Sequence, residues 1–166
     1  QVLADVGNFV ATIDTTFGGF RERADATYAL LKDSGTAFIV VAVPERDALR
    51  EAAYFVERLN QDEMPLGGLI LNRVQEVPET GLTQDQVLAA AQKLSADTTG
   101  ALTAALLGLH AERMEIKGRQ KHLASRFTAA HPSVPAQPVP AMTKDVHDLE
   151  GLREIGAALA NQEITW

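Results

Sequence analysis

The chain has 166 residues, of which 46% are hydrophobic and 22% charged, so it is long enough to form a single domain with its own core. Its net charge of -7 argues against a nucleic-acid binder held by phosphate contacts and against general attraction to anionic lipid. The chain contains no cysteine, which excludes disulfides and thiolate metal sites and is typical of a cytoplasmic protein.

The first 34 residues carry apolar side chains at every third or fourth position, which predicts amphipathic helix. Gly18-Gly19 is expected to bend or break this helix, and Gly35 stands where a glycine cap would end it. The chain begins within the helical pattern and without an initiator Met, so we expect it to be part of a longer polypeptide.

Two β-rich runs enclose a second helix. Residues 36–43 read TAFIVVAV, a continuous apolar run that predicts a parallel strand buried on both faces. Apolar residues then follow the helical period over residues 48–59, before a turn at residues 61–65. Residues 66–71, LGGLIL, predict a second buried strand that ends at the polar pair Asn72-Arg73.

Residues 75–136 are expected to be mainly helical. Thr83 and Gln86 have the spacing of a capping box for a helix that ends near residue 94. A longer helix is expected over residues 98–130, with Gly108 or Gly118 as points where it could break. Its predicted inner face carries Leu102, Leu106, Leu109, Ile116, Leu123 and Phe127.

The last part of the chain is expected to hold one strand and one helix. Residues 131–140 contain four of the seven prolines, which predicts an extended connector, and residues 139–142 predict a short third strand. A closing helix follows, with Asp148 as its N-cap. The order of elements predicts an α/β fold with a partial parallel sheet of about three strands flanked by helices.

In an open parallel sheet, ligands bind beyond the carboxyl ends of the strands. Those ends carry Pro44-Glu45, Asn72-Arg73 and Met142-Thr143-Lys144. The Asn72 amide offers an acceptor and two donors in one plane, which matches the edge of adenine, and Arg73 could stack on the ring. Pro140, Ala141 and Met142 are expected to form an apolar wall. In the alternative interpretation, Asn72 caps a turn and Arg73 is solvated.

Three segments of the chain resemble the second half of a bacterial anion-transporting ATPase. They read TTFGGFRERA (residues 15–24), GTAFIVVAVPERDALREA (35–52) and MPLGGLILNR (64–73). The family includes the arsenite-pump ATPases and the ATPases that target tail-anchored membrane proteins. Residues 139–152, VPAMTKDVHDLEGL, are similar to its last strand and helix. The resemblance covers most of the chain and is weakest over residues 76–101.

The resemblance implies half of a P-loop NTPase-type fold in a dimeric ATPase that couples ATP hydrolysis to transport or targeting of a client. In this family the Asn after the second of these strands contacts adenine, and the loop after the last strand closes over the base. By position, the implied base-binding residues are Asn72, Arg73, Pro140, Ala141, Met142 and Thr143. Pro44-Glu45 would lie at the mouth of the site, near the dimer face.

The chain also departs from the family. Its 166 residues contain no glycine-rich phosphate loop with a lysine, no second phosphate-sensing loop and no counterpart of the magnesium-binding Asp. The family carries these parts upstream, so ATP and magnesium are implied as cofactors of a parent protein. The implied partner is the N-terminal half of the same protein. We expect no catalytic residue, no ATP turnover and no tightly bound cofactor in this chain alone.

Within that resemblance, the 166 residues form one domain made of four regions: a helical region (1–34), strand-helix-strand (35–74), a second helical region (75–136), and the last strand and helix (137–166). The last-strand motif reads Pro-Ala-Met where the family has Pro-Leu-Leu. Some relatives bind a bridging zinc through a Cys-x-x-Cys pair, and this chain has no Cys and no His pair at metal-ligand spacing. No metal site is therefore predicted.

Two further features allow more than one interpretation. Phe9, Phe17 and Phe20 form a stripe that either packs inside the domain, the favoured interpretation, or holds an apolar or membrane-protein client. A basic run in the long helix either steers an anionic partner or is a solvated face, which is the favoured interpretation since Glu112 and Glu115 dilute it. The run consists of Arg113, Lys117, Arg119, Lys121 and Arg126, with His110 and His122.

The bare edge of a truncated sheet predicts a homo- or heterodimer, or association with the missing half. The expected location is the cytoplasm, and peripheral association with a membrane is left open. The alternative to an ATPase portion is a non-catalytic interaction or dimerisation module with an ATPase-derived fold. A short native product without nucleotide affinity would favour that alternative.

Overall fold

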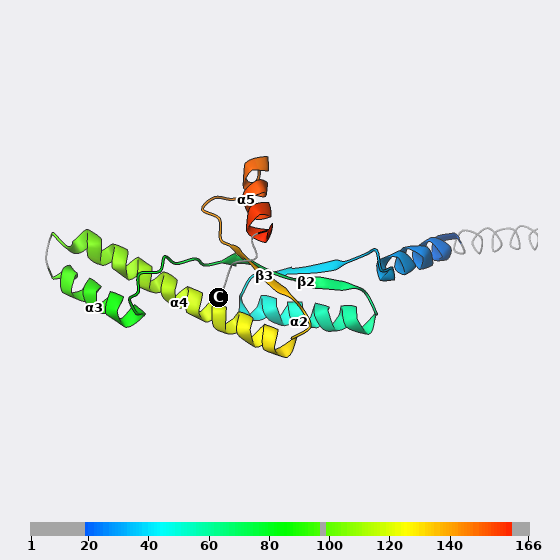
Figure 1. Cartoon of the computed structure of the whole chain (residues 1–166), viewed down its shortest axis with the longest axis horizontal. Coiled ribbons are helices and arrows are strands. Elements are labelled where there is room, and N and C mark those ends of the chain that lie inside the picture. Colours follow the sequence, from blue (N-terminus) through cyan, green and yellow to red (C-terminus); the bar gives the residue numbers. More distant parts are fainter. Residues whose placement is uncertain (1–18, 97–98, 161–166) are drawn as a thin grey trace, which may run out of the picture.

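The structure is a computed structural model that describes residues 19–96 and 99–160 (Figure 1). Three strands form one parallel sheet in the order β1 (Phe38–Ala42), β2 (Leu66–Val74), β3 (Ala136–Pro140). The helices are α2 (Arg46–Gln61), α3 (Gln84–Ser95), α4 (Ala101–Ala130) and α5 (Leu149–Ala160), and residues 19–32 are also helical. The predicted α/β fold with a partial, three-stranded parallel sheet flanked by helices is confirmed.

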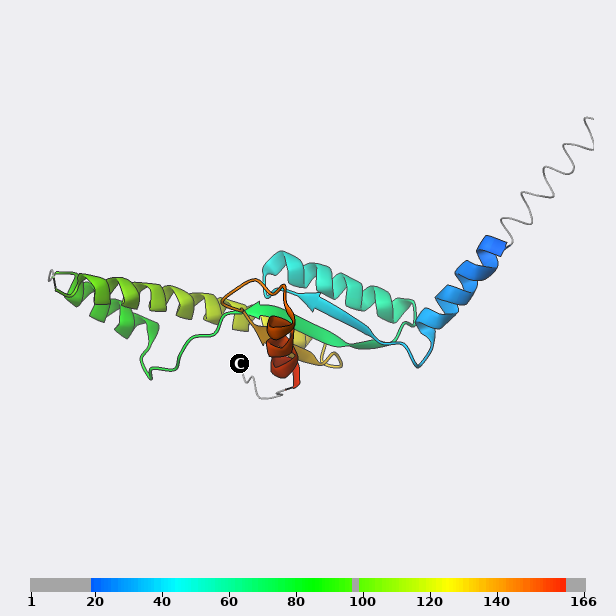
Figure 2. The same cartoon turned by 90° about the horizontal axis from the view of Figure 1, so that it is seen from above.

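The sheet lies between two layers of helix. α2 and the C-terminal half of α4 cover one face, and α5 stands on the other (Figures 1 and 2). The apolar stripe of α2 packs on β2, and Val56, Leu69 and Leu71 are at most 1% exposed at the centre of this contact. Ala124 and Phe127 of α4 complete the same cluster. Most of the described core therefore lies on the α2 and α4 side of the sheet.

α3 and the N-terminal half of α4 (residues 84–95 and 101–110) form a helical arm that extends beyond the sheet (Figure 1). The predicted capping box opens it: Gln86 N donates to Thr83 Oγ1 at 3.3 Å, and Thr83 N donates to Gln86 Oε1 at 2.8 Å. α4 then runs for 30 residues, and neither Gly108 nor Gly118 interrupts it. α4 therefore passes through both glycines without a cap or a turn.

The prediction that β1 is buried on both faces is wrong. Val40 and Ala42 pack into the core, but Ile39 is 51% exposed and Val41 is 59% exposed. The reason is the position of the helices, since α2 covers one face of β1 while α5 packs against β3. The opposite face of β1 is thus left without a covering layer among the described residues.

The inner face predicted for α4 is wrong in its first half. Leu102, Leu106 and Leu109 are all exposed, and the buried positions of this half are the small residues Ala104 and Ala111. The long helix meets α3 through its alanines, because small side chains let two helices approach closely. Further along, Leu123 packs against the core and Phe127 belongs to it, as predicted.

The third strand begins and ends earlier than predicted. β3 starts at Ala136, inside the predicted connector, and ends at Pro140 where residue 142 was expected. Bonds to β2 flank the strand at both ends: Leu69 N donates to Pro135 O and Ala141 N donates to Val74 O, both at 2.8 Å. Proline is tolerated in β3 because it is an edge strand.

Two further predictions concern the first helix. It ends at residue 32, and Gly35 does not cap it in the left-handed conformation; Asp33 Oδ1 instead accepts the Gly35 N–H at 2.8 Å. Asp33 makes this turn because a carboxylate can bond the backbone two residues on. The bend predicted at Gly18-Gly19 involves Gly18, which lies outside the described residues. Phe9 and Phe17 lie outside the described residues, and Phe20 is 66% exposed.

Candidate functional site

β2 carries Asn72 and Arg73 in a bulge near its carboxyl end. Leu71 lies opposite Pro138 and Val74 opposite Pro140, so β2 has one residue more than β3 over this stretch. The strand therefore continues to Val74, whereas the sequence predicted an end at residue 71. Arg73 takes up the extra length with a left-handed φ of 59°, and its N–H donates to Asn72 Oδ1 at 3.0 Å.

The bulge lies beside a cavity of about 620 Å³, here called the strand-end cavity. Its walls come from β2, from the end of β3, from the loop between β3 and α5, and from α5 itself. It is lined by Asn72, Arg73, Pro140, Ala141, Met142, Lys144, Asp145, Val146 and Ile155. Two segments far apart in the sequence thus meet at one edge of the sheet.

Five of the six predicted base-binding residues line this one cavity: Asn72, Arg73, Pro140, Ala141 and Met142. Thr143 lines a neighbouring hollow of about 260 Å³ that the same loop forms with the start of α5. Pro44 and Glu45, expected at the mouth of the site, line a different cavity between α2 and α4. The structure therefore joins the strand-end residues of β2 and β3 and leaves those of β1 apart.

The sequence interpretation missed Asp145, Val146 and Ile155 as lining residues. Asp145 and Val146 follow the predicted strand-end residues directly, so the position of the loop beyond a strand was the available signal. The approach of α5 depends on Gly151, whose added Cβ would lie 3.0 Å from Val146 Cγ1. Ile155 enters the cavity from α5, and nothing in the local sequence distinguishes it from the other apolar residues of that helix.

The strand-end cavity has a mainly polar surface, with apolar side chains on part of its wall. Its charged residues are Arg73, Lys144 and Asp145, and the apolar members come from both sides of the loop. The Asn72 side-chain NH₂ forms no hydrogen bond with any residue in the described ranges, so both of its N–H groups are free to donate. Such a site suits a planar, partly polar ligand with an anionic group at one end.

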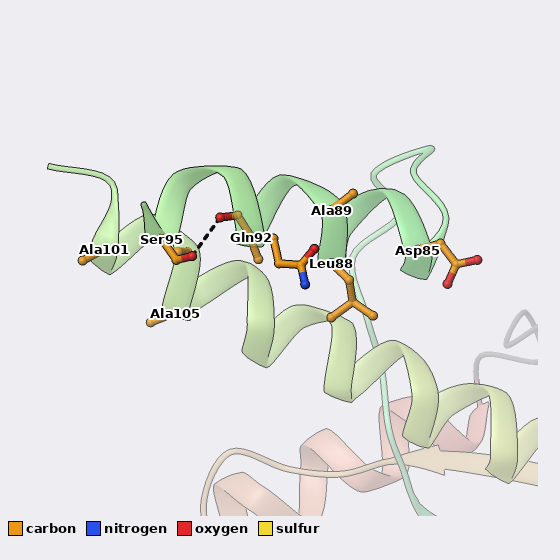
Figure 3. Close-up of a pocket in the computed structure, with 9 residues that line it drawn as sticks. Asp85, Leu88, Ala89, Gln92, Ser95, Ala101 and Ala105 are labelled. Atoms are coloured by element: carbon orange, nitrogen blue, oxygen red, sulfur yellow. Dashed lines mark hydrogen bonds between the residues drawn. The ribbon is translucent and has the colours of Figure 1, made fainter. Parts of the chain in front are cut away.

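Another cavity, of about 650 Å³, lies in the helical arm between α3 and α4 (Figure 3). Leu88 and Gln92 extend from α3 toward α4, and Ser95 Oγ donates to Gln92 O at 2.8 Å. Alanines supply most of the remaining wall, among them Ala101 and Ala105. This hollow offers mainly apolar contact and few convergent polar groups, so it provides little for the recognition of a polar ligand.

Two further observations complete the picture of the described residues. Across residues 19–96 and 99–160, no helix is both long enough and apolar enough to span a membrane. The same ranges bring no three His, Asp or Glu side chains together as metal ligands.

No protein-family model matches the chain, and a search of curated proteins found no match.

Proposed function

We propose that this chain supplies the base-binding side of an ATP site in a larger, dimeric P-loop ATPase. The parent protein would couple ATP hydrolysis to transport or targeting of a client. The observation that carries the proposal is the meeting of Asn72 and Arg73 of β2 with Pro140, Ala141 and Met142 around the strand-end cavity. The family resemblance implies a base-binding role for these same residues.

The chemistry of the cavity supports an adenine ligand. Its volume of about 620 Å³ lies within the range of small-molecule sites. The free NH₂ of Asn72 can donate to a ring nitrogen, and the apolar wall of Pro140 and Met142 suits the face of a heterocycle. Arg73, in the bulge, lines the same cavity, and a guanidinium is able to cover the outer face of a heterocyclic ring.

The proposal assigns hydrolysis to parts that these 166 residues do not contain. Phosphoryl transfer needs a phosphate loop, its lysine and magnesium, so we expect no turnover by this chain alone. In the proposed protein the N-terminal half provides those parts, and a second copy or a related subunit completes the dimer. The proposed location is the cytoplasm, with an apolar or membrane-protein client and no nucleic-acid partner.

A nucleotide titration of the isotope-labelled chain, followed by NMR, tests the proposal. ATP should shift the amide signals of residues 72–74 and 141–146, and guanosine triphosphate should shift them much less. Asn72→Ala should weaken ATP binding about tenfold, which corresponds to the ~1.4 kcal/mol of lost hydrogen bonding. Asn60→Ala is the matched control, since Asn60 is exposed on α2 outside the cavity.

Equal responses to ATP and guanosine triphosphate, or unchanged affinity in Asn72→Ala, would contradict the adenine site. Those results would favour the second candidate, a non-catalytic interaction module. That candidate has its own support in the apolar side chains left exposed on β1 and on the helical arm. A module of this kind would keep partner binding and show no nucleotide response.

A further inference from the structure

A separate cavity of about 560 Å³ lies where the start of α2 meets the C-terminal half of α4. We call it the basic cavity; it is lined by Pro44, Glu45, Arg46, Ile116, Arg119, Gln120, His122, Leu123 and Arg126. It shares no lining residue with the strand-end cavity. α2 and α4 cover the face of the sheet opposite to α5, so the two cavities belong to different layers (Figures 1 and 2).

The basic cavity concentrates positive charge in a chain whose net charge is -7. Arg46, Arg119 and Arg126 line it, and Glu45 is its one carboxylate. Within the described ranges, none of these arginines forms an ion pair; the ion pairs on α2 are made by Arg50 and Arg58. Like charges repel when they share a hollow, so an anion in it would relieve an unfavourable arrangement.

Helix geometry brings two of the arginines and a histidine to the same face of α4. Arg119, His122 and Arg126 are three, four and seven positions apart along α4, the spacing of one helix face. Arg46 approaches from the first turn of α2, where the Glu45 side chain forms no capping bond with any described residue. Guanidinium groups with free backbone N–H groups beside them are the donors that bind phosphate oxygens best.

The remaining lining residues hold this arrangement in place. Gln120 Oε1 accepts the N–H of Gln75 at 2.7 Å, which ties α4 to the segment that follows β2. Pro44, at the end of β1, is fully buried, and Leu123 packs against the core. The backbone that carries the arginines is therefore anchored at the sheet, so the cavity does not depend on a loop.

We propose that the basic cavity binds a small ligand that carries two or more phosphate charges. Its volume is that of a small-molecule site, and the strongly acidic balance of the whole chain disfavours a nucleic acid as the ligand. The inference does not rest on the proposed ATPase function, because it uses different residues on the other side of the sheet. It assigns a specific role to one part of the basic run in α4.

Calorimetric titration with inorganic pyrophosphate at constant ionic strength tests this proposal. The unmodified chain should bind in a saturable manner at one site. The double substitution Arg119→Gln, Arg126→Gln should weaken binding at least tenfold, since bonds from charged groups contribute more than neutral ones. The matched control is Arg113→Gln, Lys121→Gln, which removes the same charge from exposed positions of α4 outside the cavity. It should change the affinity less than twofold.

Three results would overturn the proposal. Equal losses in the two double variants would show a general effect of charge and no site. The absence of saturable pyrophosphate binding would exclude a phosphate ligand. The same absence is expected if the cavity instead receives an acidic segment of a partner chain. Loss of pyrophosphate binding in Asn72→Ala, with normal binding by the Arg119 and Arg126 variant, would place the anion in the strand-end cavity. Asn72→Ala thus separates this proposal from the ATPase proposal.

Discussion

Gly68 allows β2 to pass very close to the segment that leads into β3. A Cβ added at this residue would lie 2.8 Å from the carbonyl oxygen of Pro135 and 3.2 Å from its ring Cγ. The same carbonyl accepts the N–H of Leu69 at 2.8 Å, so it cannot move away without loss of that bond. A side chain at residue 68 would therefore disturb the pairing that places β3 next to the bulge.

We expect Gly68→Ala to lower the free energy of unfolding by about 1–3 kcal/mol, the usual cost of forcing atoms into a filled space. Urea denaturation followed by circular dichroism measures this change. Gly108→Ala is the control, since it sits inside a helix and its added Cβ would meet no atom within 4 Å apart from its chain neighbours and the backbone of its own helix. The control should raise stability by up to ~1 kcal/mol. Equal stability of Gly68→Ala and the unmodified chain would contradict the close approach.

At the level of single residues, the sequence predicted most of the side chains that line the candidate site but not the backbone conformation that carries them. Asn72 and Arg73 were recognisable because a polar pair follows an apolar run. The bulge was not recognisable, because a left-handed φ at an arginine arises from the register between β2 and β3. Pro138 also argued against a strand, and its tolerance depends on the position of β3 at the sheet edge.

α5 is a helix held by its cap and by few contacts. Throughout its described length it buries none of its residues fully, and Leu149 and Leu152 are exposed. Asp148 Oδ1 accepts the N–H of Gly151 at 2.8 Å, which confirms the predicted N-cap. With so little burial, the cap provides a large part of the stability of this helix.

Asp148→Ala should therefore loosen α5 without unfolding the sheet. We expect the loss of about 1 kcal/mol of helix stability, which is roughly a fivefold faster amide exchange in α5. Hydrogen exchange detected by NMR measures it residue by residue. Asp148→Asn, which retains an acceptor at the cap, should exchange as the unmodified chain does. Faster exchange in β2 as well would show that α5 and the sheet open together, against this expectation.

The sequence predicted the helices themselves better than their buried faces. The capping box at Thr83 and the cap at Asp148 depend on neighbouring residues, and both are confirmed. The buried side of α4 depends on its partner, and the leucine period gave no sign that α3 packs against Ala104. In physical terms, local bonds can be deduced from the chain, whereas burial depends on which element arrives from elsewhere.

Over the whole molecule, several large apolar side chains remain exposed in patches. One patch is the uncovered face of β1, with Ile39 and Val41, and another is the helical arm, with Leu102 and Leu106. Contiguous exposed apolar groups of this kind mark surfaces that another chain or segment covers. The patch on β1 lies beside the core, whereas the patch on the arm is far from it (Figure 1).

We expect the chain to self-associate through the β1 side. Ile39→Lys with Val41→Lys should shift the equilibrium toward monomer, because two charges on an edge strand oppose both burial and strand pairing. Sedimentation equilibrium over a range of concentrations measures the change. Leu102→Lys with Leu106→Lys is the comparison on the arm and should leave association unchanged. The assignment would be contradicted if the unmodified chain stays monomeric at every concentration. It would also be contradicted if only the arm variant shifts the equilibrium toward monomer.

The two prolines of β3 have a consequence for how this sheet can grow. Pro135 O and Ala141 N both bond to β2, and alternate residues of a strand direct their N–H and C=O groups to the same side. Pro138 and Pro140, which alternate with these residues, therefore face outward. Since proline has no N–H, the outer side of β3 presents carbonyl groups at these positions and no donors.

At the opposite edge of the sheet, Phe38 N donates to Pro65 O at 2.8 Å, so Phe38 faces β2. The neighbouring residues that alternate with it, Ile39 and Val41, therefore direct their N–H and C=O groups outward from β1. That side retains the alternating donors and acceptors that a further strand needs. The β1 edge of the sheet is consequently better suited than the β3 edge to pair with an added strand. A fourth strand, whether it comes from the same polypeptide, from a second copy or from another protein, has its place beside β1.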